Sequence, residues 1–262
     1  ALDMIGAKYL RDIENGEIIV ITESGIETIK PFKKISERPC IFERIYFASP
    51  DSIVGNKTVY TYRKALGEQL AIENNIIADV VVPIPDSGVS AAIGFSQNSK
   101  IPFELGIIRS HYVGRTFIEP SQTIRQFGVK LKHSVNRSCI ENKKVILIDD
   151  SIVRGTTASK IVKMVYEAGA KEVHLGISCP PILHPDFYGI DTPNYNQLIA
   201  SKSNLKEMTK LVGAKSLFFL SLNGTYKAMG CKKRNPKTPQ FTDHCFTGEY
   251  PIDVTEILKL NR

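Results

Sequence analysis

The string VILIDDSIVRGTT at 145–157 places two carboxylates directly after an apolar run and before a turn rich in glycine and hydroxyl groups. The apolar run 145–148 is typical of a buried strand, and 156–168 repeats apolar residues at helical spacing. A buried strand that leads through a glycine turn into a helix is the first half of a βαβ unit. The string therefore favours a parallel sheet, with Asp149 and Asp150 at the carboxyl end of a strand.

Strands and helices alternate along the rest of the chain. The expected strands are 79–82, 171–178 and 216–220, and the expected helices are 56–73, a run around 89–93, 204–211 and 254–260. Strict alternation of apolar and other residues in 171–178 predicts a half-buried strand. Two short β-branched runs, 17–22 and 26–29, predict an N-terminal β-hairpin. The whole pattern predicts an α/β fold with a mostly parallel sheet.

Composition narrows the class of partner. The chain has 262 residues, 42% of them hydrophobic, which is enough for a sizeable core. A net charge of +7 suits a polyanionic ligand, but the basic residues are scattered, so we expect no nucleic acid. No apolar run approaches the ~20 residues of a membrane helix, and no signal peptide opens the sequence. Five dispersed cysteines indicate reduced thiols, so we expect a cytoplasmic protein without a membrane partner.

The two aspartates need an explanation, because adjacent carboxylates repel each other. Ribose hydroxyls can stabilise the two carboxylates by donating hydrogen bonds, and Mg²⁺ can stabilise them by its positive charge. Residues 151–157 can wrap N–H groups and hydroxyls around a phosphate, helped by the positive end of the next helix and by Gly155. An isolated Asp pair is more often a solvated turn that caps a helix. The whole string favours a sugar-phosphate site.

That string resembles the phosphoribosyl diphosphate motif of the type I phosphoribosyltransferases. Over nearly all of its length the chain is similar to the amidophosphoribosyltransferase family, in the strings RPCIFERIYFASPDS (38–52), VVPIPDSG (81–88), YVGRTFIEP (112–120), GVKLKH (128–133), HPDFYGID (184–191) and CFTGEYP (245–251). The resemblance implies the type I phosphoribosyltransferase fold, a twisted parallel sheet with helices on both faces. It also implies the first committed step of purine synthesis, in which phosphoribosyl diphosphate, glutamine and water give phosphoribosylamine, diphosphate and glutamate.

The resemblance implies roles for individual residues. Ser87, Asp149 and Asp150 are expected to hold Mg²⁺. The expected substrate-binding residues are Asp86, Ser87, Gly88, Asp149, Asp150, Ser151, Arg154, Gly155, Thr156 and Thr157. The string PIPDSG at 83–88 can cradle the diphosphate with its amides, although by itself it would be an ordinary turn that caps a helix.

The segment 109–137 resembles the family's flexible lid. Its catalytic cations are expected to be Arg109, Arg115, Lys130 and Lys132, which would screen the diphosphate charge as the bond to carbon 1 breaks. A closed lid would also exclude water from the ribosyl centre.

Three parts are expected in this sequence: 1–36 as a remnant of the end of a glutaminase domain, 37–228 as the phosphoribosyltransferase domain, and 229–262 as a C-terminal tail. Family members carry a glutaminase domain that begins with a catalytic cysteine, whereas this sequence begins with Ala1, and ALDMIGAKYLRD resembles the close of that domain. We therefore expect most of the glutaminase to be absent, by truncation or as a separate chain, and ammonia to be the direct nucleophile.

Some family members hold a [4Fe–4S] cluster on four cysteines. Cys40 and Cys245 match two of those positions, but Asp186 and Thr242 stand at the other two. Because such a cluster needs four thiolates, we expect no iron–sulfur cluster, and we interpret Cys40 and Cys245 as ordinary buried thiols.

Three functions are compatible with parts of this pattern. The first is a transferase that makes phosphoribosylamine from ammonia, and the second is a non-catalytic regulatory module that binds phosphoribosyl diphosphate or purine nucleotides. The third, a salvage enzyme acting on a purine base, lacks a recognisable aromatic hood. The Asp pair together with a basic lid favours catalysis. The resemblance further implies a homo-oligomer that purine nucleotides inhibit.

Overall fold

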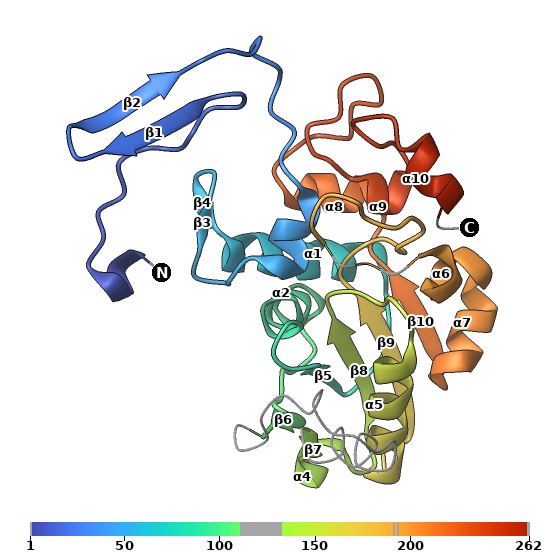
Figure 1. The fold of residues 1–262 in the computed structure, drawn as a ribbon. Coiled ribbons are helices and arrows are strands. Elements are labelled where there is room, and N and C mark those ends of the chain that lie inside the picture. The colour runs from blue at the N-terminus through green and yellow to red at the C-terminus, as the bar shows by residue number, and fades with distance from the viewer. Residues whose placement is uncertain (1, 111–132, 191, 193, 261–262) are drawn as a thin grey trace, which may run out of the picture.

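The centre of the molecule is a parallel sheet of four strands. The computed structural model describes residues 2–110, 133–190, 192 and 194–260 (Figure 1). The strands lie in the order β10, β9, β8, β5, with bounds Ser216–Phe219, Glu172–Ile177, Lys144–Asp149 and Val80–Pro83. The parallel sheet predicted from the sequence is confirmed.

Helices cover both faces of this sheet. After β5, helix α2 (Val89–Ser99) carries the chain to the side of β5 that faces away from β8. There Phe103 forms a parallel bridge with Val81. Helices α5 (Thr156–Glu167) and α7 (Leu205–Val212) lead in the opposite direction, from β8 to β9 and on to β10. Because parallel crossovers are right-handed, opposite directions put helices on opposite faces. The direction reverses between β5 and β8, and ligands of open α/β sheets bind at the carboxyl ends of such a strand pair.

Helix α1 (Val59–Glu73) packs on α2 with the two backbones in contact. A Cβ on Gly67 would lie 1.8 Å from the carbonyl oxygen of Ala91, and one on Gly94 would lie 2.0 Å from that of Lys64. The helix begins later than predicted, because 57–58 forms a strand instead. Strands β3 (Ile53–Val54) and β4 (Lys57–Thr58) make a short hairpin before the helix.

Strand β9 is buried on both faces, so the prediction of a half-buried strand was wrong. Its residues after Glu172 are all buried, including His174 and Gly176. The strand is central, and each face is covered by helices, so even its non-apolar positions lie inside. A Cβ on Gly176 would lie 2.6 Å from the Phe218 ring, which explains the glycine. His174 Nδ1 lies 2.8 Å from Ser216 Oγ.

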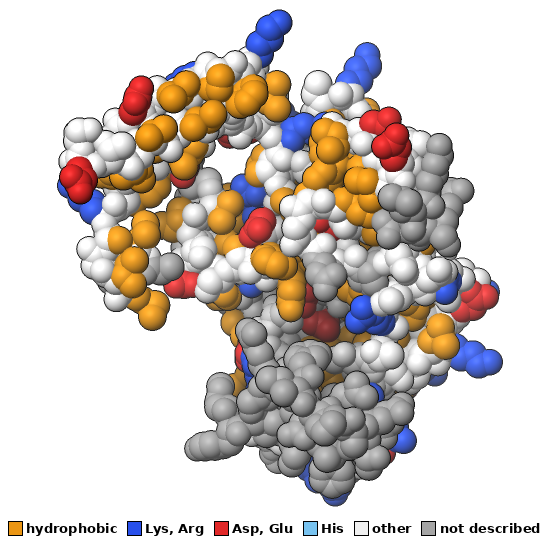
Figure 2. Space-filling model, viewed as in Figure 1, with side chains coloured by type: hydrophobic (Ala, Val, Ile, Leu, Met, Phe, Trp, Pro, Cys, Tyr) orange, Lys and Arg blue, Asp and Glu red, His pale blue; other side chains and the backbone are white. Residues whose placement is uncertain are grey.

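The N-terminal hairpin forms as predicted. Strands β1 (Ile18–Thr22) and β2 (Gly25–Ile29) pair antiparallel and stand apart from the main sheet (Figure 1). Apolar side chains gather on the hairpin face seen in Figure 2, and Ile21 is 76% exposed. A short helix η1 (Leu2–Ile5) precedes it.

A second small sheet is separate from the main one. Strand β6 (Ile107–Arg109) pairs antiparallel with β7 (His133–Val135), and α4 (Arg137–Ile140) follows. The remaining short helices are η2 (Glu43–Phe47), η4 (Tyr195–Gln197), α6 (Ile199–Lys202), α8 (Leu222–Ala228), α9 (His244–Thr247) and α10 (Thr255–Leu260).

The segment after α8 folds back into the core. Phe241, Cys245 and Phe246 are buried members of the hydrophobic core. The amide of Thr242 donates to the carbonyl of Pro39 at 3.0 Å, and the Thr242 carbonyl accepts from the amide of Ile41 at 3.1 Å. Residues near 40 and near 242 are thus joined side by side. Among the residues described, no helix is both long and apolar enough to cross a membrane.

Candidate active site

A cleft of about 500 Å³ lies at the carboxyl ends of β5 and β8. Most of the residues singled out in the sequence line it together: Ser87, Asp149, Asp150, Ser151, Arg154, Gly155, Thr156 and Thr157. The two strings that carry them are more than sixty residues apart in the chain. The fold brings them together because β5 and β8 are hydrogen-bonded neighbours.

The turn 83–88 reaches the end of β8 because of a glycine. A Cβ on Gly88 would lie 2.2 Å from the carbonyl oxygen of Ile148, so only glycine allows this approach. The approach puts Ser87 Oγ 3.3 Å from Asp149 Oδ1. The serine hydroxyl and the first aspartate therefore face one another across the two strand ends.

The Asp pair carries unfavourable negative charge. Desolvation raises the pKa of Asp149 well above its ordinary value, and the charge of Asp150 raises it further. The amide of Asp150 donates to Asp149 Oδ1 at 2.9 Å, and Ser151 Oγ donates to Asp150 Oδ2 at 2.6 Å. Two carboxylates and a hydroxyl are the hard oxygen ligands that Mg²⁺ prefers, and a bound cation would offset this charge. The residues present therefore fit a magnesium ion.

The loop 151–157 runs directly into the N-terminus of α5. Gly155 is the N-cap residue with φ of 78°, a left-handed conformation that favours glycine. A Cβ there would also lie 2.8 Å from Ile199 Cδ1. The first turn of α5 leaves backbone amides without partners inside the helix, and a loop that leads into such a terminus is the arrangement of phosphate-binding helix termini.

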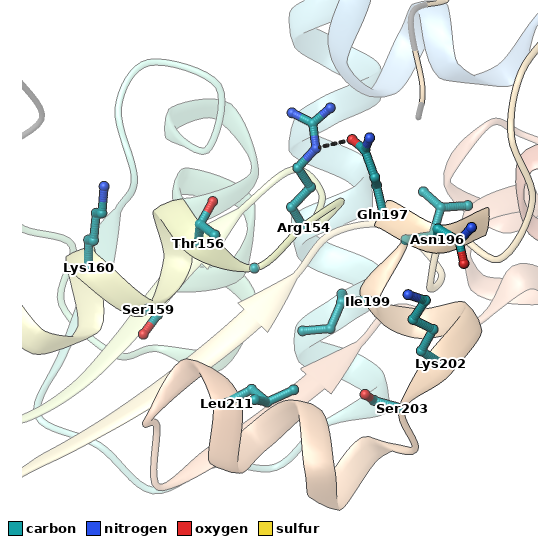
Figure 3. A pocket seen from close by; sticks show the side chains of 12 residues that line it. Arg154, Thr156, Ser159, Lys160, Asn196, Gln197, Ile199, Lys202, Ser203 and Leu211 are labelled. Carbon is teal, nitrogen blue, oxygen red and sulfur yellow. Dashed lines mark hydrogen bonds between the residues drawn. The ribbon is translucent and has the colours of Figure 1, made fainter. Parts of the chain in front are cut away.

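Arg154 lies on the rim between this cleft and a second hollow. Its Nε donates to Gln197 Oε1 at 2.8 Å, as Figure 3 shows. The second hollow, of about 520 Å³, lies between α5 and the segment of η4 and α6, and Lys160 and Lys202 also line it. The side chain of Arg154 is thus turned toward η4, and its role in substrate binding stays a prediction.

Asp86 and Arg109 lie beside the cleft, in a neighbouring hollow of about 550 Å³ that shares Ser87 with it. The two side chains form an ion pair with each other. Gly88 lies beneath the turn rather than on the cleft surface. The other three predicted cations, Arg115, Lys130 and Lys132, lie outside the described residues.

Several cleft residues were given no role from the sequence. Tyr46 and Phe47 of η2 line the cleft, and Arg63 holds the end of that helix by donating to the carbonyl of Ala48 at 2.7 Å. Gly189 and Ile190 line it from the segment after β9, and His133 lines it from β7. The signal available was their position in the strings ERIYF and HPDFYGID, which resemble the family but do not reveal what their side chains contact.

Positions 40, 186, 242 and 245, which match the ligands of an iron–sulfur cluster in some family members, lie close together. Residues 40 and 242 form a bridge, and Cys245 follows three residues later in the chain. Both cysteines are free thiols, and desolvation raises the pKa of each. Cys245 is buried as predicted, whereas Cys40 is only partly buried, so the prediction was wrong for Cys40. Asp186 is instead hydrogen-bonded to His244, and the distance between Asp186 Oδ2 and His244 Nε2 is 2.7 Å. Within the described ranges, no group of three or more His, Cys, Asp or Glu side chains is arranged to hold a metal ion.

Comparison with known proteins places the chain among named relatives, although no protein-family model matches it. It is 60% identical to the amidophosphoribosyltransferase of Rhizobium etli over 262 residues, covering 98% of this chain and 53% of that protein. It is 48% identical to a chloroplastic amidophosphoribosyltransferase of Arabidopsis thaliana, covering 98% and 44%. The solved structure of the Bacillus subtilis glutamine phosphoribosylpyrophosphate amidotransferase, complexed with ADP and GMP, matches with a TM-score of 0.87 at 46% identity, covering 97% and 56%.

These matches confirm the fold predicted from the resemblance. The parallel sheet, the helices on both faces and the extra hairpin form a type I phosphoribosyltransferase fold with an appended N-terminal segment. The chain spans about half the length of the curated relatives it matches. With whole-chain identities of this size, the chain belongs to the amidophosphoribosyltransferase family.

Proposed function

We propose that this chain is the phosphoribosyltransferase part of an amidophosphoribosyltransferase and that it makes phosphoribosylamine from phosphoribosyl diphosphate and ammonia. One observation carries the proposal: Ser87, Asp149, Asp150 and the loop 151–157 share one cleft at the point where the sheet reverses direction. Family membership supports it, because the relatives bear the name of that enzyme.

The geometry supports a division of labour in substrate binding. The loop 151–157 and the first amides of α5 would hold the 5′-phosphate, and Asp149 and Asp150 would accept hydrogen bonds from ribose hydroxyls. The turn 83–88 would receive the diphosphate beside Ser87. Ser87, Asp149 and Asp150 would hold Mg²⁺, which when bound supplies positive charge next to the departing diphosphate.

The reaction needs positioning more than it needs a base. The bond from carbon 1 to the diphosphate oxygen breaks with its electron pair leaving on diphosphate, and the lone pair of ammonia forms the new carbon–nitrogen bond. The nitrogen then releases a proton to water. Holding the sugar at the strand ends sets the angle of attack. Arg109, Arg115, Lys130 and Lys132 are proposed to screen the charge that develops on the leaving group.

The direct test is diphosphate release from phosphoribosyl diphosphate with ammonium chloride and Mg²⁺. We expect release that requires all three and that rises with pH, since only neutral ammonia is a nucleophile. Tight binding of phosphoribosyl diphosphate without any release would favour the regulatory module instead. No binding and no release would reject both.

Further proposals rest on the family. The Bacillus subtilis relative was solved in complex with ADP and GMP, and we propose that purine nucleotides also bind and inhibit this protein. We also propose that the protein is a homo-oligomer and that the chain divides into a glutaminase remnant (1–36), a phosphoribosyltransferase domain (37–228) and a C-terminal tail (229–262). We propose a cytoplasmic location, because the five cysteines are free thiols.

A further inference from the structure

We propose that Asp186 and His244 are positioning residues of the cleft. Together they fix the turn after Pro185, and this turn supplies the wall formed by Gly189 and Ile190. The inference deepens the proposed function and rests on it, since it assigns the wall to the same substrate site.

Asp186 is the centre of the turn. One carboxylate oxygen, Oδ1, accepts the amides of Tyr188 at 2.7 Å and of Ile190 at 3.1 Å. Its own amide donates to Thr192 Oγ1 at 2.6 Å. Ile190 and Thr192 both line the cleft. A single side chain therefore sets the backbone path of a segment that lines the cleft.

His244 ties that side chain to the body of the protein. Nε2 lies 2.7 Å from Asp186 Oδ2, and the two side chains are 2% and 3% exposed. The imidazole stacks on Tyr250, with ring centroids 5.0 Å apart, and meets the edge of Tyr188 at 5.1 Å. Its helix α9 is held in turn by Arg234, whose Nε donates to Asp243 Oδ2 at 2.6 Å. The pair thus connects the turn to a rigid part of the core.

The hydrogen bonds identify the donor and the acceptor of this pair. Among the described residues His244 Nδ1 has no hydrogen-bond partner, whereas Nε2 faces Asp186 Oδ2. A carboxylate oxygen accepts, so Nε2 is the ring nitrogen placed to donate. Desolvation alone would raise the pKa of Asp186, but bonds from His244 and two amides outweigh it and the pKa is lowered. The carboxylate is therefore ionised, and its bonds are charge-assisted.

Other contacts hold the same segment just before the turn. The amide of His184 donates to the carbonyl of Cys245 at 3.1 Å, and the hydroxyl of Tyr250 donates to the carbonyl of Pro185 at 2.9 Å. These bonds do not depend on the Asp186 carboxylate. Loss of that carboxylate should therefore free the turn while the segment stays anchored, so the effect should appear in the cleft wall rather than in the fold.

The experiment compares graded variants by amide hydrogen exchange of 186–190 and by calorimetric binding of phosphoribosyl diphosphate with Mg²⁺. Asp186→Asn keeps an oxygen for the two amides but removes the charge and the acceptor facing His244, whereas Asp186→Ala removes everything. We expect faster exchange in the turn and a Kd raised about tenfold by Ala and less by Asn, because binding of the substrate depends on a correctly positioned wall. His244→Phe should behave like Asp186→Asn. His244→Gln can still donate a hydrogen bond to Asp186, so its exchange rates and Kd should stay close to those of the wild type.

Ser216→Ala is the matched control. It removes a partly buried hydrogen bond, the one to His174, at the opposite end of the sheet strands, so it should lower stability while Kd and exchange in the turn stay unchanged. An unchanged Kd in a variant whose turn exchanges faster would overturn the inference, and so would unchanged exchange in Asp186→Ala. If that variant fails to fold, Asp186→Asn and His244→Phe decide the matter. A wild-type chain that binds no phosphoribosyl diphosphate would reject the proposed function, while the exchange data would still show whether the pair holds the turn.

Discussion

Asp149 illustrates a conflict between stability and binding within one residue. Its carboxylate is desolvated and lies beside Asp150, which raises its pKa well above the ordinary value. An acid with a raised folded-state pKa contributes stability that is fully present below its unfolded pKa and is lost as the pH rises through the folded value. The Asp149 carboxyl therefore supports the ligand-free fold less at neutral pH than in acid.

Asp149→Asn is accordingly expected to stabilise the ligand-free chain at pH 7, by on the order of 1 kcal/mol, since one pKa unit corresponds to about that energy. Binding of phosphoribosyl diphosphate with Mg²⁺ should be largely lost in the same variant, by on the order of 2 kcal/mol or more. Urea denaturation and calorimetry measure the two effects. The stability gain should shrink at pH 4, and a variant that is less stable than wild type at pH 7 would contradict the electrostatic explanation.

His174 makes the opposite prediction for mildly acidic solution. Desolvation lowers the pKa of this imidazole, and the nearby Glu172 does not fully offset it. A base with a lowered folded-state pKa gives its full stability above the unfolded pKa of about 6.5 and loses it as the pH falls below that value. We expect the urea midpoint of wild type to fall between pH 7.5 and pH 5.5, and His174→Gln to lose part of that dependence. Equal pH dependence in both proteins would show that His174 does not carry it.

At the scale of elements, the sequence predicted those helices and strands whose burial pattern and end residues are close together in the chain. The strand–turn–helix of 145–167 and the capped helix α7 lie within two residues of their expected bounds, because their burial pattern and end residues are adjacent in sequence. The turn 83–88 and the Asp pair were found for the same reason. The pairing of β6 with β7, by contrast, depends on partners more than twenty residues apart.

The elements that were missed depend on tertiary context. The alternation of apolar and other residues in β9 predicts a strand with one face exposed to solvent. Helices cover both faces, however, so the residues after Glu172 are all buried. Arg234 and Asp243 belong to a segment that looks like a polar tail, but they form an ion pair whose side chains are 9% and 0% exposed. The cleft wall at Tyr46 and Ile190 was missed because its role comes from where the backbone lies, which no local pattern reports.

The contact between α1 and α2 gives a prediction about packing. Gly94→Ala would place a Cβ 2.0 Å from the Lys64 carbonyl oxygen, so the two helices must separate. We expect a loss of about 3 kcal/mol of unfolding free energy, at the upper end for overpacked sites. Gln97→Ala, exposed on the same helix, should change stability by less than about 0.5 kcal/mol. Chemical denaturation of both variants tests this, and equal stabilities would refute the close contact.

At the scale of the whole molecule, the thiols bear on the nitrogen source. Taking nitrogen from glutamine requires a reactive thiolate. Burial raises the pKa of Cys40, Cys179, Cys231 and Cys245, and raised values disfavour the thiolate. These positions are therefore poor candidates for a glutaminase nucleophile.

The 262-residue chain by itself is thus expected to release diphosphate with ammonium chloride and none with glutamine. The measurement is diphosphate release with each nitrogen source over a pH series, with the Asp149→Asn variant as the blank. Ammonia-dependent release should climb as ammonium deprotonates. Turnover with glutamine would mean that one of the five cysteines is the nucleophile after all.

The join between residues 39–41 and Thr242 has a consequence for how the protein is made. A ribosome delivers the first of these segments some two hundred residues before the second. His244, which ties down Asp186, follows that residue by 58 positions in the chain. The strands of the sheet can pair while the chain is still emerging, but the cleft wall is expected to stay loose until residue 244 has left the exit tunnel. The order of synthesis therefore delays a formed substrate site until after all four strands of the sheet have been made.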